Sequence, residues 1–198
     1  MFLTRIEINS SRVAMNWMNN PYRVHQRLMM GCDQDPRVLF RVEENENGLL
    51  ILVQSHNAPN WQAAFNGFQV LAGNPQIKSF DANSISAGLY HFRLIANPTI
   101  KKNGKRLGLI KEKDQVQWIE RKMQDAGARI VQCQLINKGF IYCHKTVSSA
   151  KEQQTYLSVQ YDGVLDVIEP PSMIKALENG VGAAKGYGFG LISLARLH

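Results

Sequence analysis

A tyrosine and a histidine stand three residues apart in a short basic segment near the N-terminus. If Asn20–Arg27 is helical, Tyr22 and His25 share one face, because residues i and i+3 are neighbours on a helix surface. Arg23 and Arg27 are four residues apart and fall on an adjacent stripe. A helix N-terminus attracts phosphate, and histidine titrates at about pH 6.5. The segment is therefore a candidate acid/base site at a phosphate, although a lone histidine is more often structural.

A glycine-rich segment near the C-terminus is the second candidate. Residues 180–190 hold five of the chain's fifteen glycines, a density that lets backbone N–H groups approach a phosphate closely. The segment lacks the GK[ST] ending of a P-loop, and it follows a predicted helix instead of the strand that a dinucleotide fingerprint requires. Residues 185–189 match only the opening of the RNP1 pattern of RNA-recognition domains. Lys185 favours a loop that faces an anion, and a tight helix-to-strand connection is the alternative.

The rest of the sequence excludes several classes of catalytic site. His91 and His144 fall within predicted strands. The chain has no HxxxH pair, no paired-carboxylate site and no GxSxG, so metallohydrolase, glycosidase and serine-hydrolase functions have no support. Cys32, Cys133 and Cys143 have no CxxC spacing, which argues against a disulfide framework and against a zinc site. We therefore expect neither a metal nor a cofactor.

The charge balance favours an anionic partner. The 198 residues include 23 Lys and Arg against 16 Asp and Glu, which gives a net charge of +7. Nucleic acid is a better candidate than a membrane surface, because no basic amphipathic helix stands out. No apolar run approaches the ~20 residues of a membrane span, and the first ten residues alternate in polarity instead of forming a secretory signal. We expect a cytoplasmic protein that does not associate with membranes.

The elements that must position these residues follow an α+β pattern. Residues 2–8 alternate as a strand, and Asn20-Pro21 opens a helix that ends at Gly31. Further predicted elements of the first half are a hairpin of 38–43 with 49–55, a short helix within 56–80, and a strand over 89–96. The order is that of a ferredoxin-like domain, which we assign to residues 1–96.

The second half repeats this plan after a basic stretch. Residues 97–111 hold five Lys and Arg and no acid, and are interpreted as a basic linker. A second ferredoxin-like domain is then expected over residues 112–198, with the glycine-rich segment as its loop. Its predicted elements are a helix over 113–126 closed by Gly127, strands over 128–136, 139–146 and 156–167 with a bulge at Gly163, a helix over 172–178 and a strand over 189–197.

Seven blocks in this order resemble the CasE family of CRISPR repeat-RNA endoribonucleases, the processing subunit of Cascade. The most specific is the ending GVGAAKGYGFGLISLA at 180–195, which is similar to the family's glycine-rich signature. The other blocks are YRVH at 22–25, the hairpin pieces at 39–43 and 52–55, FRLIANP at 92–98, the K-R and L-I-K pieces of 105–111, QWIERK at 117–122 and GVLDV at 163–167. Gln26 departs from the arginine that relatives often carry, so Arg23 or Arg27 would have to supply that cation.

The resemblance implies a fold and a reaction. The fold is α+β, with two tandem ferredoxin-like (RRM-like) βαββαβ domains. The reaction is metal-independent cleavage of CRISPR precursor RNA at the 3′ base of the repeat hairpin, by attack of a 2′-OH that leaves 2′,3′-cyclic phosphate and 5′-OH ends. The implied catalytic residues are His25 as acid/base, Tyr22 as a positioning or proton-transfer group, and Lys185 as a cation for the transition state or for holding the flanking RNA strand.

The implied partners are the repeat hairpin, retained as mature crRNA, and the other Cascade subunits, with a monomer as the isolated state. Two alternatives stay open, a non-cleaving hairpin-binding scaffold subunit and a basic protein that binds a nucleotide at the glycine loop. The residues expected to contact RNA are cations and loop glycines: Arg23, Arg27, Lys101, Lys102, Lys105, Arg106, Lys138, Lys145, Lys151, Gly180, Gly182, Gly186 and Gly188.

Overall fold

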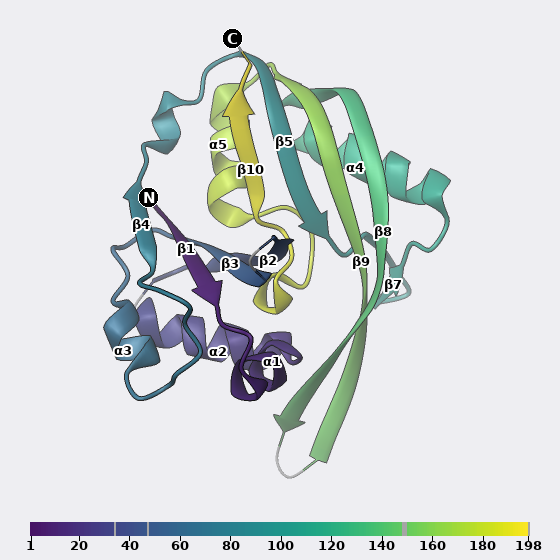
Figure 1. The fold of residues 1–198 in the computed structure, drawn as a ribbon. Coiled ribbons are helices and arrows are strands. Elements are labelled where there is room, and N and C mark those ends of the chain that lie inside the picture. The colour runs from purple at the N-terminus through teal and green to yellow at the C-terminus, as the bar shows by residue number, and fades with distance from the viewer. Residues whose placement is uncertain (34, 47, 148–149, 198) are drawn as a thin grey trace. The chain divides into compact units, whose positions relative to one another are not determined.

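The computed structural model describes residues 1–33, 35–46, 48–147 and 150–197 of a mixed α+β chain (Figure 1). The chain divides into two compact units, and each is built on a four-stranded sheet. The first unit comprises Met1–Asp81, Tyr142–Gln154 and Gly186–Gly188. The second comprises Ala82–Ile141, Thr155–Lys185 and Phe189–His198.

The sheet of the first unit has the strand order β2-β3-β1-β4, and its neighbours pair antiparallel. Its strands are β1 (Phe2–Ile8), β2 (Leu39–Asn45), β3 (Gly48–Ser55) and β4 (Gln76–Ser79). Its helices are α1 (Arg12–Met18), α2 (Pro21–Gly31) and α3 (Trp61–Phe65). With α1 and α2 between β1 and β2, and α3 between β3 and β4, the arrangement is ferredoxin-like.

Helix α2 forms where the sequence predicts it. The Asn20 side chain caps it by accepting a hydrogen bond from the Tyr22 N–H at 3.2 Å, and Pro21 occupies the first turn. Val24 and Leu28 are fully buried in the core of the first unit. At the last residue, Gly31, an added methyl group would lie 2.7 Å from the ring of Trp61, so only glycine allows this contact with α3.

The second unit repeats the topology with the strand order β10-β5-β9-β8. Its strands are β5 (Gly88–Ala96), β8 (Ala128–Val147), β9 (Ala150–Val167) and β10 (Ile192–Arg196), with the two-stranded hairpin β6 (Thr99–Lys102) and β7 (Lys105–Gly108). Its helices are α4 (Glu112–Asp125) and α5 (Pro170–Asn179), with a 3₁₀ turn η1 (Ala82–Ser84). The prediction of two tandem ferredoxin-like domains is confirmed.

The domain boundary differs from the one expected at residue 96. Strand β5 pairs with β9 and β10, and its inward residues Tyr90, Phe92 and Leu94 belong to the core of the second unit. The fourth strand of the first sheet is β4, whose four residues are all exposed. An exposed strand need not alternate between polar and apolar residues. The sequence pattern therefore favoured the next alternating segment, residues 89–96, as the last strand of the first domain.

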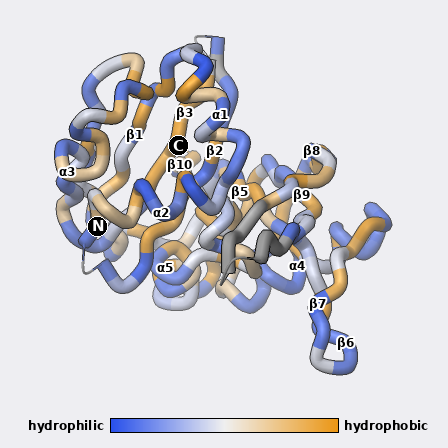
Figure 2. Tube along the Cα trace, turned by 90° about the horizontal axis from the view of Figure 1, so that it is seen from below, coloured by the Kyte–Doolittle hydropathy of each residue, from blue (hydrophilic) through white to orange (hydrophobic). Residues whose placement is uncertain are grey.

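The basic stretch 97–111 contains the hairpin β6–β7, where a linker was expected. Asn103 and Gly104 at its tip have φ angles of 49° and 77°, which is the left-handed geometry that an Asn-Gly turn favours. Lys101 lies opposite Arg106, and Lys102 lies opposite Lys105. Both strands are largely exposed, and Figure 2 colours the tip beside β6 as hydrophilic. Like charges directly opposite one another repel, so the hairpin is suited to an anionic partner.

One prediction on the long hairpin of the second sheet was wrong. Strand β8 runs without a break over Ala128–Val147, although Asn137-Lys138 was interpreted as a turn. The pairing of β9 with β5 is regular through Gly163, so no bulge interrupts this ladder. On its other side Gly163 approaches β8 closely, because an added methyl group would collide with the Gln132 carbonyl. No described helix is long and apolar enough to cross a membrane.

Candidate functional site

Tyr22 and His25 lie on α2 in the first unit, and both are half-buried. The imidazole of His25 stacks on the ring of Phe40 from β2, with centroids 6.0 Å apart and planes 13° apart. Phe40 has no exposed surface. The histidine ring is therefore positioned by a rigid core residue and not by a flexible surface side chain.

The glycine-rich loop contacts the same part of α2. A methyl group added at Gly186, in the 3₁₀ turn η2 (Lys185–Tyr187), would lie 3.3 Å from His25 Cδ2 and 3.4 Å from Nε2. The ring of Tyr187 lies 6.2 Å from that of Tyr22. Gly188 has a φ of +87°, and a methyl group there would lie 3.1 Å from Phe40. The structure thus brings together the two segments that the sequence singled out separately.

Burial sets the protonation of the histidine. Removal from water lowers the pKa of His25 below 6.5, because the charged imidazolium loses its hydration. Its Nδ1 atom is buried and has no hydrogen-bond partner in the described part of the chain. A phosphate beside the ring would favour the charged form, since an opposite charge within a few ångströms stabilises it. The site therefore holds a neutral imidazole that is sensitive to an anion.

The two arginines of α2 differ in availability. Arg27 donates a hydrogen bond from Nη1 to the Ala64 carbonyl at 3.0 Å, and its guanidinium lies 4.4 Å from the centre of the Phe68 ring. Arg23 is exposed. Arg23 is therefore the better candidate to contact a phosphate near Tyr22 and His25.

A group of cations lies in the second unit. Lys185 Nζ donates a hydrogen bond to the Gly182 carbonyl at 2.8 Å, and both residues line a cavity of about 410 Å³. At Gly182 an added methyl group would lie 2.9 Å from the Trp118 ring, so the backbone packs directly on that ring. The other residues that line the cavity are Thr99, Arg106, Trp118, Arg121, Lys122 and Ala183. With four cations and no carboxylate in this lining, the cavity is suited to an anion.

The remaining predicted RNA contacts are spread over the chain. The cations Lys101, Lys102 and Lys105 are exposed on the β6–β7 hairpin, and Lys138 is exposed on β8. Gly180 ends α5 with a φ of +73°. The side chains of Lys145 and Lys151 lie outside the described residues.

Sequence reasoning missed several residues at these sites. Phe40, which stacks on His25, belongs to an apolar strand and carries no chemical signal of its own. Tyr187 OH donates a hydrogen bond to Gln154 Oε1 at 2.8 Å, a long-range contact that no local pattern predicts. Arg121 and Lys122 follow Trp118 at helical spacing (i+3 and i+4), and that spacing was the available signal for the second cavity.

Other chemistries find little support among the described residues. None of the described His, Cys, Asp and Glu side chains form a group of three able to hold a metal ion. Burial raises the pKa of the Cys32, Cys133 and Cys143 thiols to about 11, so none of them is a ready thiolate nucleophile.

Comparison with known proteins gives consistent matches over the whole chain. A family model described as CRISPR associated protein matches residues 1–196. The chain is 30% identical to the CRISPR-associated endoribonuclease Cse3 of Thermus thermophilus, covering 98% of this chain and 100% of that protein. It is 32% identical to the CRISPR system Cascade subunit CasE of Escherichia coli K12, covering both chains completely. A solved structure of Thermus thermophilus Cse3 bound to an RNA representing a pre-cleavage complex matches with a TM-score of 0.79, 27% identity and 98% coverage of both chains.

Proposed function

Because the chain belongs to this family of CRISPR-associated proteins, we propose that it is the endoribonuclease that cleaves CRISPR precursor RNA at the 3′ base of the repeat hairpin. We further propose that it stays bound to the mature crRNA as a subunit of Cascade in the prokaryotic cytoplasm. The names of its full-length relatives support the activity and the assembly. The observation that carries the proposal is the His25 imidazole, which stacks on the buried Phe40 ring and has Gly186 of the glycine-rich loop close beside it.

The proposed reaction is a transesterification that needs no metal. The ribose 2′-oxygen attacks the adjacent phosphorus while the bond from phosphorus to the 5′-oxygen of the next nucleotide breaks. The 2′-OH loses its proton to solvent through the Tyr22 hydroxyl, and the leaving 5′-oxygen takes a proton from His25. The products are a 2′,3′-cyclic phosphate and a 5′-OH end. Each positioned proton transfer contributes about 10²–10⁴-fold to such a rate.

The cations around the site have separate roles in this proposal. The phosphorane-like transition state carries more negative charge than the substrate, so donors fixed near it lower the barrier. Arg23 follows Tyr22 directly in the chain, so it lies within one residue of the proposed acid/base pair. We assign Arg23 to the phosphate at the cut, and Lys185, which lines the cation-rich cavity of the second unit, to a phosphate of the flanking RNA strand. The exposed cations of the β6–β7 hairpin bind phosphates of the RNA stem, which is recognised mainly by shape.

The first experiment measures cleavage of the host's hairpin repeat RNA in EDTA by the wild type and by His25→Ala. The wild type should cut at the 3′ base of the hairpin and leave a cyclic-phosphate end. His25→Ala should bind the RNA normally and cleave about 10²–10⁴-fold more slowly. The matched control is His91→Ala, which removes an exposed imidazole from β5 and should cleave at the wild-type rate.

Three other outcomes would contradict parts of the proposal. Tight binding of the hairpin without cleavage by the wild type would make the protein a non-cleaving scaffold subunit. Cleavage that EDTA abolishes would contradict the metal-independent reaction. Equal rates for His25→Ala and the wild type would remove His25 from the chemical step.

A further inference from the structure

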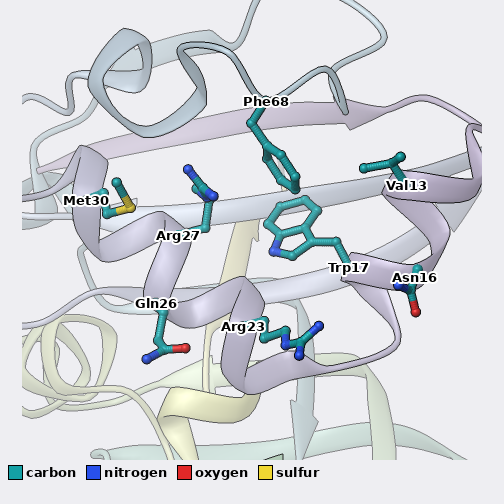
Figure 3. A pocket seen from close by; sticks show the side chains of 8 residues that line it. All are labelled: Val13, Asn16, Trp17, Arg23, Gln26, Arg27, Met30 and Phe68. Carbon is teal, nitrogen blue, oxygen red and sulfur yellow. The ribbon is translucent and has the colours of Figure 1, made fainter.

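A second cavity lies in the first unit, along α2 beside the stripe of Tyr22 and His25 (Figure 3). We call it the α1–α2 pocket. Its volume is about 400 Å³, within the range of small-ligand sites. It is lined by Val13, Asn16, Trp17, Arg23, Gln26, Arg27, Met30 and Phe68. The four residues from α2 follow the spacing i, i+3, i+4 and i+7, so they form one stripe beside the stripe of Tyr22 and His25.

The floor of the pocket is made of flat groups that are held in place. Trp17 is 6% exposed, and its ring meets that of Phe68 edge-to-face with centroids 5.5 Å apart. The Arg27 guanidinium lies over Phe68, and its hydrogen bond to the Ala64 carbonyl fixes it there. Aromatic rings and guanidinium planes of this kind are the surfaces on which unpaired nucleobases stack.

Polar groups at the pocket are suited to the edges and the phosphate of a nucleotide. Trp17 Nε1 is buried without a hydrogen-bond partner among the residues that the structure describes, and Figure 3 shows it turned toward the side chains of Arg23 and Arg27. Gln26 supplies an amide that donates and accepts, and exposed Arg23 supplies a charge for a phosphate. The lining has no carboxylate, so nothing in it repels an anion.

The position of the pocket along α2 indicates which nucleotide it takes. Arg23 adjoins Tyr22 and Gln26 adjoins His25 in the chain, so a nucleotide in the pocket is a near neighbour of the cleaved phosphate. On the 5′ side of the cut the RNA is paired in the stem. The unpaired nucleotides near the cut therefore lie on its 3′ side.

We propose that the α1–α2 pocket binds an unpaired nucleotide of the RNA segment 3′ of the cleaved bond, by stacking its base and contacting its phosphate through Arg23. This inference rests on the proposed function. The pocket would make the affinity for the substrate differ from the affinity for the product. The substrate contacts the pocket and the retained stem-loop product does not, so cleavage itself removes this contribution to affinity.

The test measures dissociation constants for hairpin RNAs with a 2′-deoxyribose at the cleavage position, which prevents the attack. One RNA ends at the cleavage position, and others carry one, two or three 3′ nucleotides, with or without a base at each. The wild type should bind a flanked RNA about tenfold more tightly than the unflanked one, the size expected for one stacked base. Loss of the base at one flank position should remove this advantage.

Variants identify the pocket as the cause. Gln26→Ala changes an exposed side chain that has no other role in the proposed reaction, and it should lose the flank advantage while binding the unflanked hairpin within about twofold of the wild type. The matched control Arg37→Gln removes an exposed arginine elsewhere in the first unit and should keep the full advantage.

The outcomes separate this inference from the proposed function. Cleavage of ordinary repeat RNA without any flank advantage would overturn the pocket and leave the nuclease intact. A flank advantage that Gln26→Ala retains would overturn it as well, because the flank would then bind elsewhere. Absence of both hairpin binding and cleavage by the wild type would overturn the proposed function and the inference with it.

Discussion

The protonation state of His25 decides which half of the reaction it can serve. Burial lowers its pKa below 6.5, so the neutral form dominates at neutral pH in the absence of RNA. A general acid must carry the proton that it delivers, and only the minor charged form does so. The lowered pKa therefore makes the two roles of His25, acid or base, distinguishable by their opposite dependence on pH.

The single-turnover cleavage rate at saturating protein should fall as the pH rises through the pKa of His25, by about tenfold per pH unit once the imidazole is mostly neutral. Measurement between about pH 5.5 and 8.5 covers this range. In the RNA-free protein, an NMR titration of the imidazole should give a midpoint below 6.5. A rate that instead rises with pH to a plateau above this midpoint would assign His25 to the 2′-OH proton as a general base.

At the scale of elements, the glycine loop serves the histidine in a way that the sequence did not predict. Gly186 was expected to present its N–H to phosphate, and the structure adds a second constraint, because a methyl group at this position would lie 3.3 Å from His25 Cδ2. The imidazole cannot move freely away from an added methyl group, because it stacks on Phe40, which is itself fully buried. The loop and strand β2 together restrict the orientation of the imidazole.

Gly186→Ala should therefore slow cleavage by about tenfold or more, because a displacement of a few tenths of an ångström misaligns the proton donor. RNA affinity and the urea midpoint of unfolding should change little, since Gly186 has no left-handed φ that alanine would strain. Gly73→Ala is the matched control, because an added methyl group there meets no atom within 4 Å. Equal rates for the two variants would show that the loop does not position His25.

The elements show how far the sequence could predict this structure. The caps of α2, the β2–β3 hairpin and the helix α4 were predictable because their signals are local: Asn20-Pro21, the polar turn, and the helical repeat that Gly127 ends. The membership of β5 in the second sheet was not predictable, because alternating polarity indicates a strand but does not indicate which strand it pairs with. Helix α1 was missed, although it contributes the Trp17 ring on which the α1–α2 pocket depends.

The same limit applies to the sites. Tyr22 and His25 were predictable from their spacing on one helix, and the family resemblance supplied their roles. Lys185 was grouped with them by the resemblance, yet its amine donates a hydrogen bond within the second unit and lines a cavity with Arg106 and Arg121. Side-chain direction depends on the fold of the loop, in this case on Gly182 packed against Trp118, and no spacing in the sequence encodes it.

At the scale of the whole molecule, the net charge of +7 is distributed unevenly. The β6–β7 hairpin carries four cations on residues that are nearly all exposed, and it places like charges opposite one another. Such a hairpin is destabilised by repulsion in isolation and is stabilised when phosphates lie beside it. Its contribution should therefore be visible in the salt dependence of RNA binding, which reports how many phosphates the cations of the protein neutralise.

The double variant Lys102→Gln/Lys105→Gln should lower the slope of log Kd against log salt concentration by about 1.5, because each phosphate that is no longer neutralised removes about 0.7–0.9 from that slope. The cleavage rate at saturating protein should stay unchanged, because these side chains contact the stem and not the cut. Lys113→Gln/Lys175→Gln removes the same charge from exposed positions on α4 and α5 and should leave the slope nearly intact. If both variants lowered the slope equally, the RNA would be responding to net charge alone, and the β6–β7 hairpin would have no defined place on the RNA stem.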